Sequence, residues 1–374
     1  MNLRENTLAI LRYQPFNKLP VVAFGYWAET VDKWADEGHI PREWAEDYKQ
    51  NGDNGFGDEA IMARLGFDYN WNRLIASNVL MDPPFETQVL EEKPDGSQVI
   101  RDWQGLICLV KPGVVSIPAE IGTSLTGREA WEELYLPRLQ MNAGRLPLDA
   151  ARAMPAPAQR DKPMGLHLGS LIGHMRNMLG VEHLSYLYSD DEDLYREIVD
   201  TLCGLCYQCA KGMLETGAQF DYAHYWEDIC YNHGPLVSPA VMRELVAPWY
   251  HKINSMMNGA GVDIISLDCD GCIDAMVPIW LENGVNTMFP IEVGTWQASI
   301  APWRQQYGKE LRGVGGMNKT VFSRDRAAVD AEVERLKPLV ALGGYIPCPD
   351  HRIAPDAEFG LVQYYCEKMQ ELKV

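Results

Sequence analysis

The stretch Asp263-Ile-Ile-Ser-Leu-Asp-Cys-Asp-Gly271 is an apolar run of strand length that ends abruptly in acidic residues. Side chains alternate between the two faces of a strand, so Asp268 and Asp270 are expected on one face and Cys269 on the other. Two buried carboxyl groups on one face require a cation, a shared proton or hydrogen-bond donors to compensate them. The alternative is that Asp270 starts a turn and Asp268 caps the next helix.

A similar unit recurs along the chain: a short apolar run, a polar tip and then an amphipathic helix. Repetition of such units predicts a closed α/β fold, the (β/α)8 TIM barrel. An open doubly wound sheet is the alternative, but no glycine-rich dinucleotide fingerprint follows the first run. The expected strands lie in residues 21–27, 66–71, 165–170, 219–228, 262–270, 286–292, 311–319 and 343–351.

Three segments interrupt this pattern within what is expected to be one domain, 1–374. Residues 28–60 are acidic and aromatic at helical spacings, which predicts a helical capping excursion. Residues 86–118 surround the turn Pro94-Asp-Gly96 and predict an antiparallel β-hairpin insertion. A helix is expected over 126–150, followed by an Ala/Pro/Arg-rich linker, 151–163.

The composition excludes several partners. A net charge of −19 and a pI near 4.8, without a cluster of basic residues, argue against nucleic acid. No apolar run is long enough to span a membrane, and the N-terminal residues lack the apolar core of an export signal. The nine cysteines are an odd number spread through a long chain, which is typical of reduced thiols. We therefore expect a cytoplasmic protein, for which a homodimer is left open.

The active site of such a barrel lies at the C-terminal ends of its strands. Carboxylates dominate the residues expected there, which favours a cation, a metal or a proton over a polyanionic ligand. Lys319, Arg352 and the histidines could hold one acidic group of a substrate. The residues at the expected strand ends are Trp27, His167, Tyr225, Trp226, Glu227, Asp228, Asp268, Asp270, Glu292, Asn318, Lys319, Cys348, Asp350 and His351.

Other motifs are weaker. The cysteines in Cys203-Gly-Leu-Cys-Tyr-Gln-Cys209 lie within a helical pattern, which favours core packing over ligation. Cys269-Asp-Gly-Cys272 has the spacing of a redox motif but directly follows a core strand. The glycines of Gly313-Val-Gly-Gly316 fit either a phosphate cradle or close packing of a helix on a strand, and both remain open.

The second half of the chain resembles the uroporphyrinogen decarboxylase superfamily, firmly over about residues 160–370. As a set the matching motifs are specific. They are Trp226-Glu-Asp228, Gly234-Pro-Leu-Val-Ser-Pro239, Pro248-Trp-Tyr250, Asp268-Cys-Asp-Gly271, Pro278-Ile-Trp-Leu-Glu-Asn-Gly-Val-Asn286, Pro290-Ile-Glu-Val293, Gly315-Gly-Met-Asn-Lys319 and Gly343-Gly-Tyr-Ile-Pro-Cys-Pro-Asp-His351.

The resemblance implies a (β/α)8 barrel and one of two activities: porphyrinogen decarboxylation without a cofactor, or zinc-dependent methyl transfer involving a corrinoid protein or a thiol. The chain lacks an arginine-rich N-terminal segment for a polyanionic tetrapyrrole, so it is more similar to the methyltransferase branch. Zinc methyltransferases of the superfamily carry His-x-Cys where this chain has Asp268-Cys-Asp270, and Cys348 matches a later cysteine ligand. An oxygen-rich ligand set suits an oxygen-bound methyl group better than a thiol.

We therefore expect methyl transfer from a small methoxylated aromatic donor to a corrinoid protein, with metal or acid activation of the leaving oxygen. Zinc would be held by Asp268, Asp270 and Cys348, or by Glu227 in place of Asp268. The expected catalytic residues are Asp270, Glu227, His351 and Lys319, and the expected substrate-binding residues are Trp27, His167, Tyr225, Trp226, Asp228 and Glu292, with Trp71 in the aromatic wall.

Two other functions remain open. A cofactor-independent decarboxylase of a small acid or a porphyrinogen-like substrate would use Lys319 or Arg352 to bind the carboxylate. A non-catalytic binding barrel would use the same pocket without turnover.

Overall fold

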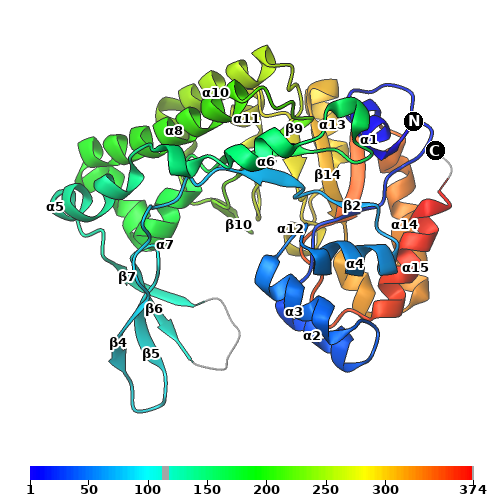
Figure 1. The fold of residues 1–374 in the computed structure, drawn as a ribbon, viewed down its shortest axis with the longest axis horizontal. Helices are drawn as coiled ribbons and strands as arrows, with labels where there is room; N and C mark the ends of the chain where they lie inside the picture. Colours follow the sequence, from blue (N-terminus) through cyan, green and yellow to red (C-terminus); the bar gives the residue numbers. More distant parts are fainter. Residues whose placement is uncertain (112–117, 373–374) are drawn as a thin grey trace.

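The computed structural model describes residues 1–111 and 118–372. Its centre is a seven-stranded sheet in the order β15-β14-β13-β12-β9-β8-β3, in which all neighbouring strands are parallel. The strands are mostly buried on both faces, because helices surround the sheet (Figure 1). They are β3 (Leu74–Ala76), β8 (Gly165–Gly169), β9 (Tyr222–Trp226), β12 (Ile265–Asp268), β13 (Thr287–Phe289), β14 (Arg312–Met317) and β15 (Tyr345–Pro349).

A parallel pair of short strands, β1 (Val22–Ala23) and β2 (Tyr69–Asn70), closes this sheet into a barrel. After β1, the chain bonds to the segment that follows β15: Trp27 N–H donates to Ile353 O (3.1 Å), and Ile353 N–H donates to Gly25 O (3.0 Å). After a short bend β2 leads into β3, at the other edge of the sheet. The predicted (β/α)8 barrel is confirmed, with its second strand position divided between β2 and β3.

Amphipathic helices cover the outside of the barrel. In α8, the cysteines 203, 206 and 209 face the core with Leu202 and Leu205, so their interpretation as core residues is confirmed. None of the helices in the described residues combines the length and apolar character needed to cross a bilayer. The main covering helices are α1 (Leu3–Leu11), α7 (Gly173–Asp190), α8 (Glu192–Glu215), α10 (Ala247–Gly259), α11 (Val277–Glu282), α13 (Ile300–Tyr307), α14 (Arg326–Val340) and α15 (Phe359–Gln370).

The two expected additions to the barrel are present. The capping excursion contains α2 (Ala28–Asp36), α3 (Arg42–Asn51) and α4 (Phe56–Leu65). The insertion is a four-stranded antiparallel sheet that projects beside α7 (Figure 1). It extends beyond the predicted boundary at 118, and residues 112–117 of the prediction lie outside the described residues. Its strands are β4 (Gln88–Glu92), β5 (Gln98–Arg101), β6 (Leu106–Val110) and β7 (Ala119–Thr123).

The single helix predicted over 126–150 is wrong. Pro137 and Pro147 lack the N–H groups that a continuous helix needs, and the segment breaks into short pieces. It contains α5 (Arg128–Ala130), a π-helical turn (Trp131–Tyr135), 3-10 turns (Leu136–Leu139, Ala143–Arg145) and α6 (Leu148–Ala153), and the predicted linker therefore starts inside α6.

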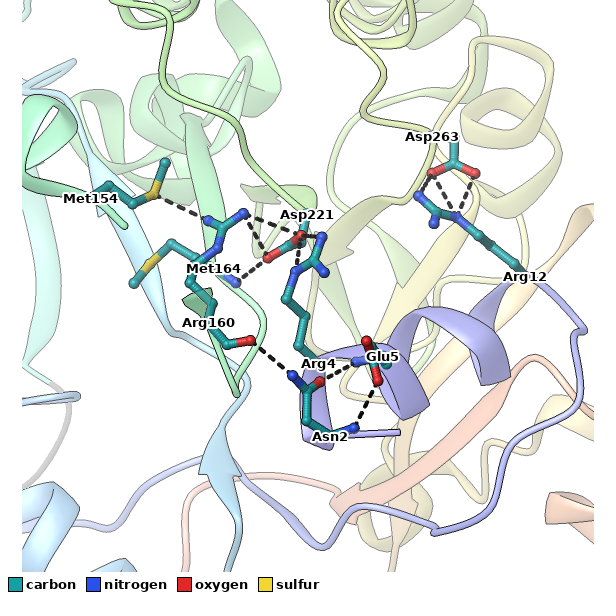
Figure 2. Close-up of polar contacts among 9 residues, drawn as sticks. All are labelled: Asn2, Arg4, Glu5, Arg12, Met154, Arg160, Met164, Asp221 and Asp263. Atoms are coloured by element: carbon teal, nitrogen blue, oxygen red, sulfur yellow. Dashed lines mark hydrogen bonds and ion pairs between the residues drawn. The ribbon is translucent and has the colours of Figure 1, made fainter. Parts of the chain in front are cut away.

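The predicted linker is anchored at the N-terminal end of the barrel. Arg160 is buried and lies 3.4 Å from Asp221, which also accepts hydrogen bonds from Arg4 Nε (2.7 Å) and Met164 N–H (2.9 Å), as Figure 2 shows. A second pair in the figure, Arg12–Asp263 (2.6 Å), joins α1 to the start of the 263–271 stretch. These ion pairs lie before the strands begin, so they stabilise the end of the barrel opposite the expected site.

The glycines of 313–316 serve close packing. A Cβ atom on Gly315 would lie 1.4 Å from Pro290 O, and Gly315 has a φ of +129°. A Cβ atom on Gly313 would meet the side chains of Ile291 and Ile300. This crowding favours the packing interpretation over a phosphate cradle, because the space beside these glycines is already filled.

Candidate functional site

A cavity of about 410 Å³ opens at the C-terminal ends of the strands. Its volume is in the usual range for small-molecule sites. The lining combines acidic residues with apolar and aromatic ones. The lining residues are Phe24, Asp53, Asn54, Asn72, Leu74, Ala76, His167, His224, Trp226, Asp268, Asp270, His351 and Arg352.

Strand register places these residues at two depths. His167 in β8 is paired with His224 in β9, which is paired with Ser266 in β12. Two residues further along, Trp226 is paired with Asp268. Side chains two residues apart share a face and are about 7 Å apart along the strand. The histidines therefore lie at the inner end of the cavity, where Leu74 is two residues deeper still, and Asp268 lies nearer its mouth.

The Asp268 carboxyl group faces the cavity without a hydrogen-bond partner among the described residues. The residue is only 8% exposed. Burial raises its pKa well above the usual value, the Asp270 and Asp228 carboxylates raise it further, and the Arg352 guanidinium acts in the opposite direction. These effects favour the acid form of Asp268.

Asp270 pairs with His351 across the barrel. Its Oδ2 atom lies 3.2 Å from His351 Nε2. The imidazole is stacked on Trp27, with ring centroids 5.8 Å apart and an angle of 15° between planes, and lies 5.6 Å from the Phe24 ring. Stacking on Trp27 fixes the ring that contacts Asp270, so Trp27 supports the site from its mouth.

Two further carboxyl groups lie next to Asp270, and each is held by the protein. Asp228 pairs with Arg176 (3.1 Å), and Glu292 accepts hydrogen bonds from Gly271 N–H (2.6 Å) and the Thr295 hydroxyl (3.0 Å). Burial, followed by the charge of Asp270, raises the pKa of both Asp228 and Glu292. Neither lines the cavity, so they act on it through their charge.

Arg352 is a cation of the cavity wall whose charge is already compensated. Its guanidinium binds Asp53 through two hydrogen bonds, 2.9 and 2.6 Å, and also donates to Tyr48 Oη (2.9 Å). Asp53 and its neighbour Asn54 come from the loop between α3 and α4, so the excursion contributes directly to the site. The sequence contained no signal for this pairing.

His167 is a neutral hydrogen-bond donor at the inner end. Burial lowers its pKa to about 4, so the ring is uncharged at neutral pH. Its Nδ1 atom accepts the N–H of Gly169 (2.9 Å), which a β-bulge between the two residues makes available. A neutral imidazole with an accepting Nδ1 carries its proton on Nε2. His167 therefore presents an N–H group to the cavity.

Glu227, expected to be catalytic, lies outside the cavity and is fully buried. Its carboxyl group holds the first turn of α7, where unpaired N–H groups favour a carboxylate. The donors are the hydroxyl of Ser170 (2.8 Å), the N–H groups of Leu171 (2.9 Å), Ile172 (3.0 Å) and Gly173 (3.0 Å), and the hydroxyl of Tyr250.

Four other expected residues, Tyr225, Lys319, Cys348 and Trp71, also lie outside the cavity. Tyr225 points to the outer helices and donates to Asn254 Oδ1 (2.9 Å). Lys319 Nζ donates to the backbone oxygen of Arg352 (2.9 Å), and Cys348 is fully buried. Trp71, from the expected aromatic wall, lies beneath the cavity, stacked on Tyr222.

The expected zinc ligands are not brought together, because Asp268 and Asp270 line the cavity and Cys348 does not. Within 1–111 and 118–372, no three His, Cys, Asp or Glu side chains are placed to hold one metal ion. As placed, the described Asp268, Asp270 and Cys348 side chains do not form a zinc site.

A scan against protein-family models and a search of curated protein sequences both find no match. Among solved structures, the chain is similar to a methyltransferase from Methanosarcina mazei (16% identity, 99% of this chain and 99% of that chain covered, TM-score 0.61). Two B12-independent methionine synthases also match: one from Listeria monocytogenes (12%, 95% and 97%, 0.43) and one from Shewanella sp. W3-18-1 (11%, 59% and 65%, 0.38). The first similarity shows that the two chains share a barrel fold over nearly their whole length.

Proposed function

We propose that the protein transfers a methyl group from a small methoxylated aromatic donor to a corrinoid carried by a partner protein, with Asp268 as the acid. The observation that carries this proposal is the buried, unpaired Asp268 carboxyl group, whose pKa is raised mainly by burial. The fold shared with the Methanosarcina mazei methyltransferase supports it as well.

Asp268 supplies the proton that the transfer step requires. The bond between the methyl carbon and the ether oxygen breaks, and its electron pair stays on the oxygen. The proton of Asp268 passes to that oxygen, so that the product leaves as a phenol and Asp268 becomes a carboxylate. A reduced corrinoid, when bound, supplies the nucleophile that accepts the methyl carbon.

The pair Asp270–His351 adjoins the acid and can return its proton. Asp270 is two residues from Asp268 on the same face, and its Oδ2 atom lies 3.2 Å from His351 Nε2, an imidazole nitrogen that can carry a proton. Trp226 and Phe24 supply an apolar wall for an aromatic ring. These residues line the same cavity as Asp268, which supports the proposal.

A decarboxylase of a small acid is less well supported. It needs a cation that is free to bind a substrate carboxylate, whereas Arg352 is bonded to Asp53 and Lys319 to a backbone oxygen. The remaining lining is acidic or neutral. A carboxylate in this cavity would lack a counter-charge.

The test is incubation of the purified protein with reduced cobalamin and a panel of methoxyarenes, following the cobalt spectrum. We expect methylation of cobalt with at least one donor and its loss in Asp268→Asn, which cannot supply the proton. Cys269→Ala is the matched control, because Cys269 does not line the cavity. Release of CO2 from a carboxylic acid without cobalt methylation would refute the proposal.

A further inference from the structure

The inner end of the cavity is polar without being charged. His167 and His224 line it. Burial is the main cause that lowers the pKa of each ring, and the pKa of His224 falls well below its usual value. Methyl transfer at Asp268 makes no use of these histidines, since they lie two residues deeper along the strands. Within the described residues, His224 Nδ1 lies 3.0 Å from Ser266 Oγ, whereas only Nδ1 of His167 has a partner, the Gly169 N–H.

We propose that the Nε2–H group of His167 is a subsite for an uncharged oxygen acceptor at the end of the donor opposite its methoxy group. This proposal rests on the proposed function, which places the methoxy group beside Asp268, nearer the mouth of the cavity. It narrows the donor to para-substituted methoxyarenes that carry a carbonyl or hydroxyl group.

The hydrogen-bonding state of His167 supports a donor role. Its Nδ1 atom is occupied by the Gly169 N–H, so the proton sits on Nε2. Nε2 has no hydrogen-bond partner in the described part of the chain, and His167 lines the cavity. His167 is half-buried, so a ligand that displaces water from the cavity must supply a partner for this N–H group, which a carbonyl or hydroxyl oxygen does.

The spacing supports a para arrangement. His224 lies at the inner end of the cavity, and Trp226 is paired with Asp268. These two residues of β9 are two positions apart, so the two ends are separated by about 7 Å along the strand. The para positions of a benzene ring span most of such a distance, whereas ortho substituents lie side by side. Ala76 is paired with His167 and Leu74 lies two residues deeper, so apolar groups border the ring position nearest the histidines.

The charge distribution supports an uncharged acceptor. Arg352 is the cation of the cavity wall, and Asp53 binds it through two hydrogen bonds. An anionic group at the inner end would face neutral histidines beneath several carboxyl groups, so its burial would not be compensated. A ketone or phenol makes the same hydrogen bond without that penalty.

The experiment is calorimetric titration of the full chain without cobalamin, so its outcome does not depend on methyl transfer. The probes are 4-methoxyacetophenone, its 2- and 3-isomers, methoxybenzene and 4-methoxybenzoate. We expect the tightest binding with 4-methoxyacetophenone. In His167→Leu its affinity should fall about fivefold to tenfold, the loss of one hydrogen bond. Methoxybenzene should bind both forms equally.

His167→Gln is the second variant, because a glutamine side chain retains an N–H donor; it should recover most of the affinity for the ketone. The subsite is overturned if the benzoate or the 2-isomer binds most tightly, if His167→Leu weakens ketone and methoxybenzene alike, or if no probe binds. Tight ketone binding without any cobalt methylation would keep the subsite and refute the proposed activity.

Discussion

His351 Nε2 lies 3.2 Å from Asp270 Oδ2, which joins the segment after β15 to the end of β12. Within the described residues, Asp270 Oδ1 and His351 Nδ1 have no hydrogen-bond partner. Each residue of the pair thus has a polar atom that forms no hydrogen bond with the surrounding protein. Unused polar atoms at the end of a barrel strand are more typical of a reaction site than of a stabilising contact.

Replacing His351 by phenylalanine should slow cobalt methylation about 100-fold, the usual lower effect of a lost acid–base group. The phenyl ring can keep the stacking on Trp27 and Phe24, so the change isolates the ring nitrogens. Initial rates under saturating donor measure the effect. Unchanged rates would remove His351 from the proton pathway.

Most of the fold is predictable from the sequence, because apolar runs that end in polar residues mark barrel strands. Each expected run contains a strand. The prediction of one helix over 126–150 was wrong because the apolar residues there have helical spacing, whereas Pro137 and Pro147 prevent the hydrogen bonds of a continuous helix. Local backbone chemistry here outweighs hydrophobic periodicity.

The site is less predictable. Alternate residues of a strand face the inside of the barrel, but the sequence must also show which alternate set faces inward. In 263–271 the polar residues at 266, 268 and 270 show which set faces inward. In β9 every residue from Tyr222 to Trp226 suits a buried position, and either phase is consistent with the sequence. That ambiguity explains why Tyr225 was expected in the site and His224 was not. Asp53 could not be foreseen, since a contact with Arg352 across the fold leaves no local pattern.

Replacing Glu227 by alanine should destabilise the protein by at least about 3 kcal/mol, because its donors lose their shared acceptor in a buried position. Urea unfolding measures the change. The control is Glu215→Ala, an exposed residue whose nearest cation, Lys211, is 3.7 Å away; this substitution should cost less than about 1 kcal/mol. Comparable losses in the two variants would contradict the capping role of Glu227.

Removal of metal should leave cobalt methylation unchanged. The described residues do not gather a ligand set, and in the proposed step the proton of Asp268 takes the place of a Lewis acid. Dialysis against a chelator, followed by metal analysis and rate measurement, tests this expectation. Zinc at one equivalent per chain, with activity lost on its removal and restored on its return, would show that Asp268 and Asp270 rearrange into a metal site.

The rate of methylation should fall as the pH rises through the pKa of Asp268. Only the protonated acid can donate, and burial together with Asp270 and Asp228 raises that pKa, which places the loss of activity above the usual range of an aspartate. The Arg352 charge opposes this shift, but Asp53 is bonded to the guanidinium and offsets its effect.

Asp53→Asn should therefore move the alkaline limb of the pH–rate profile to lower pH, by about one unit. An uncompensated Arg352 favours the carboxylate form of Asp268, so the acid is lost earlier as pH rises. Asp32→Asn removes the same charge from an exposed pair with Arg42 and Lys49, outside the cavity, and should leave the profile in place. A shift of the limb to higher pH in Asp53→Asn, or equal shifts in both variants, would show that Arg352 does not control the acid.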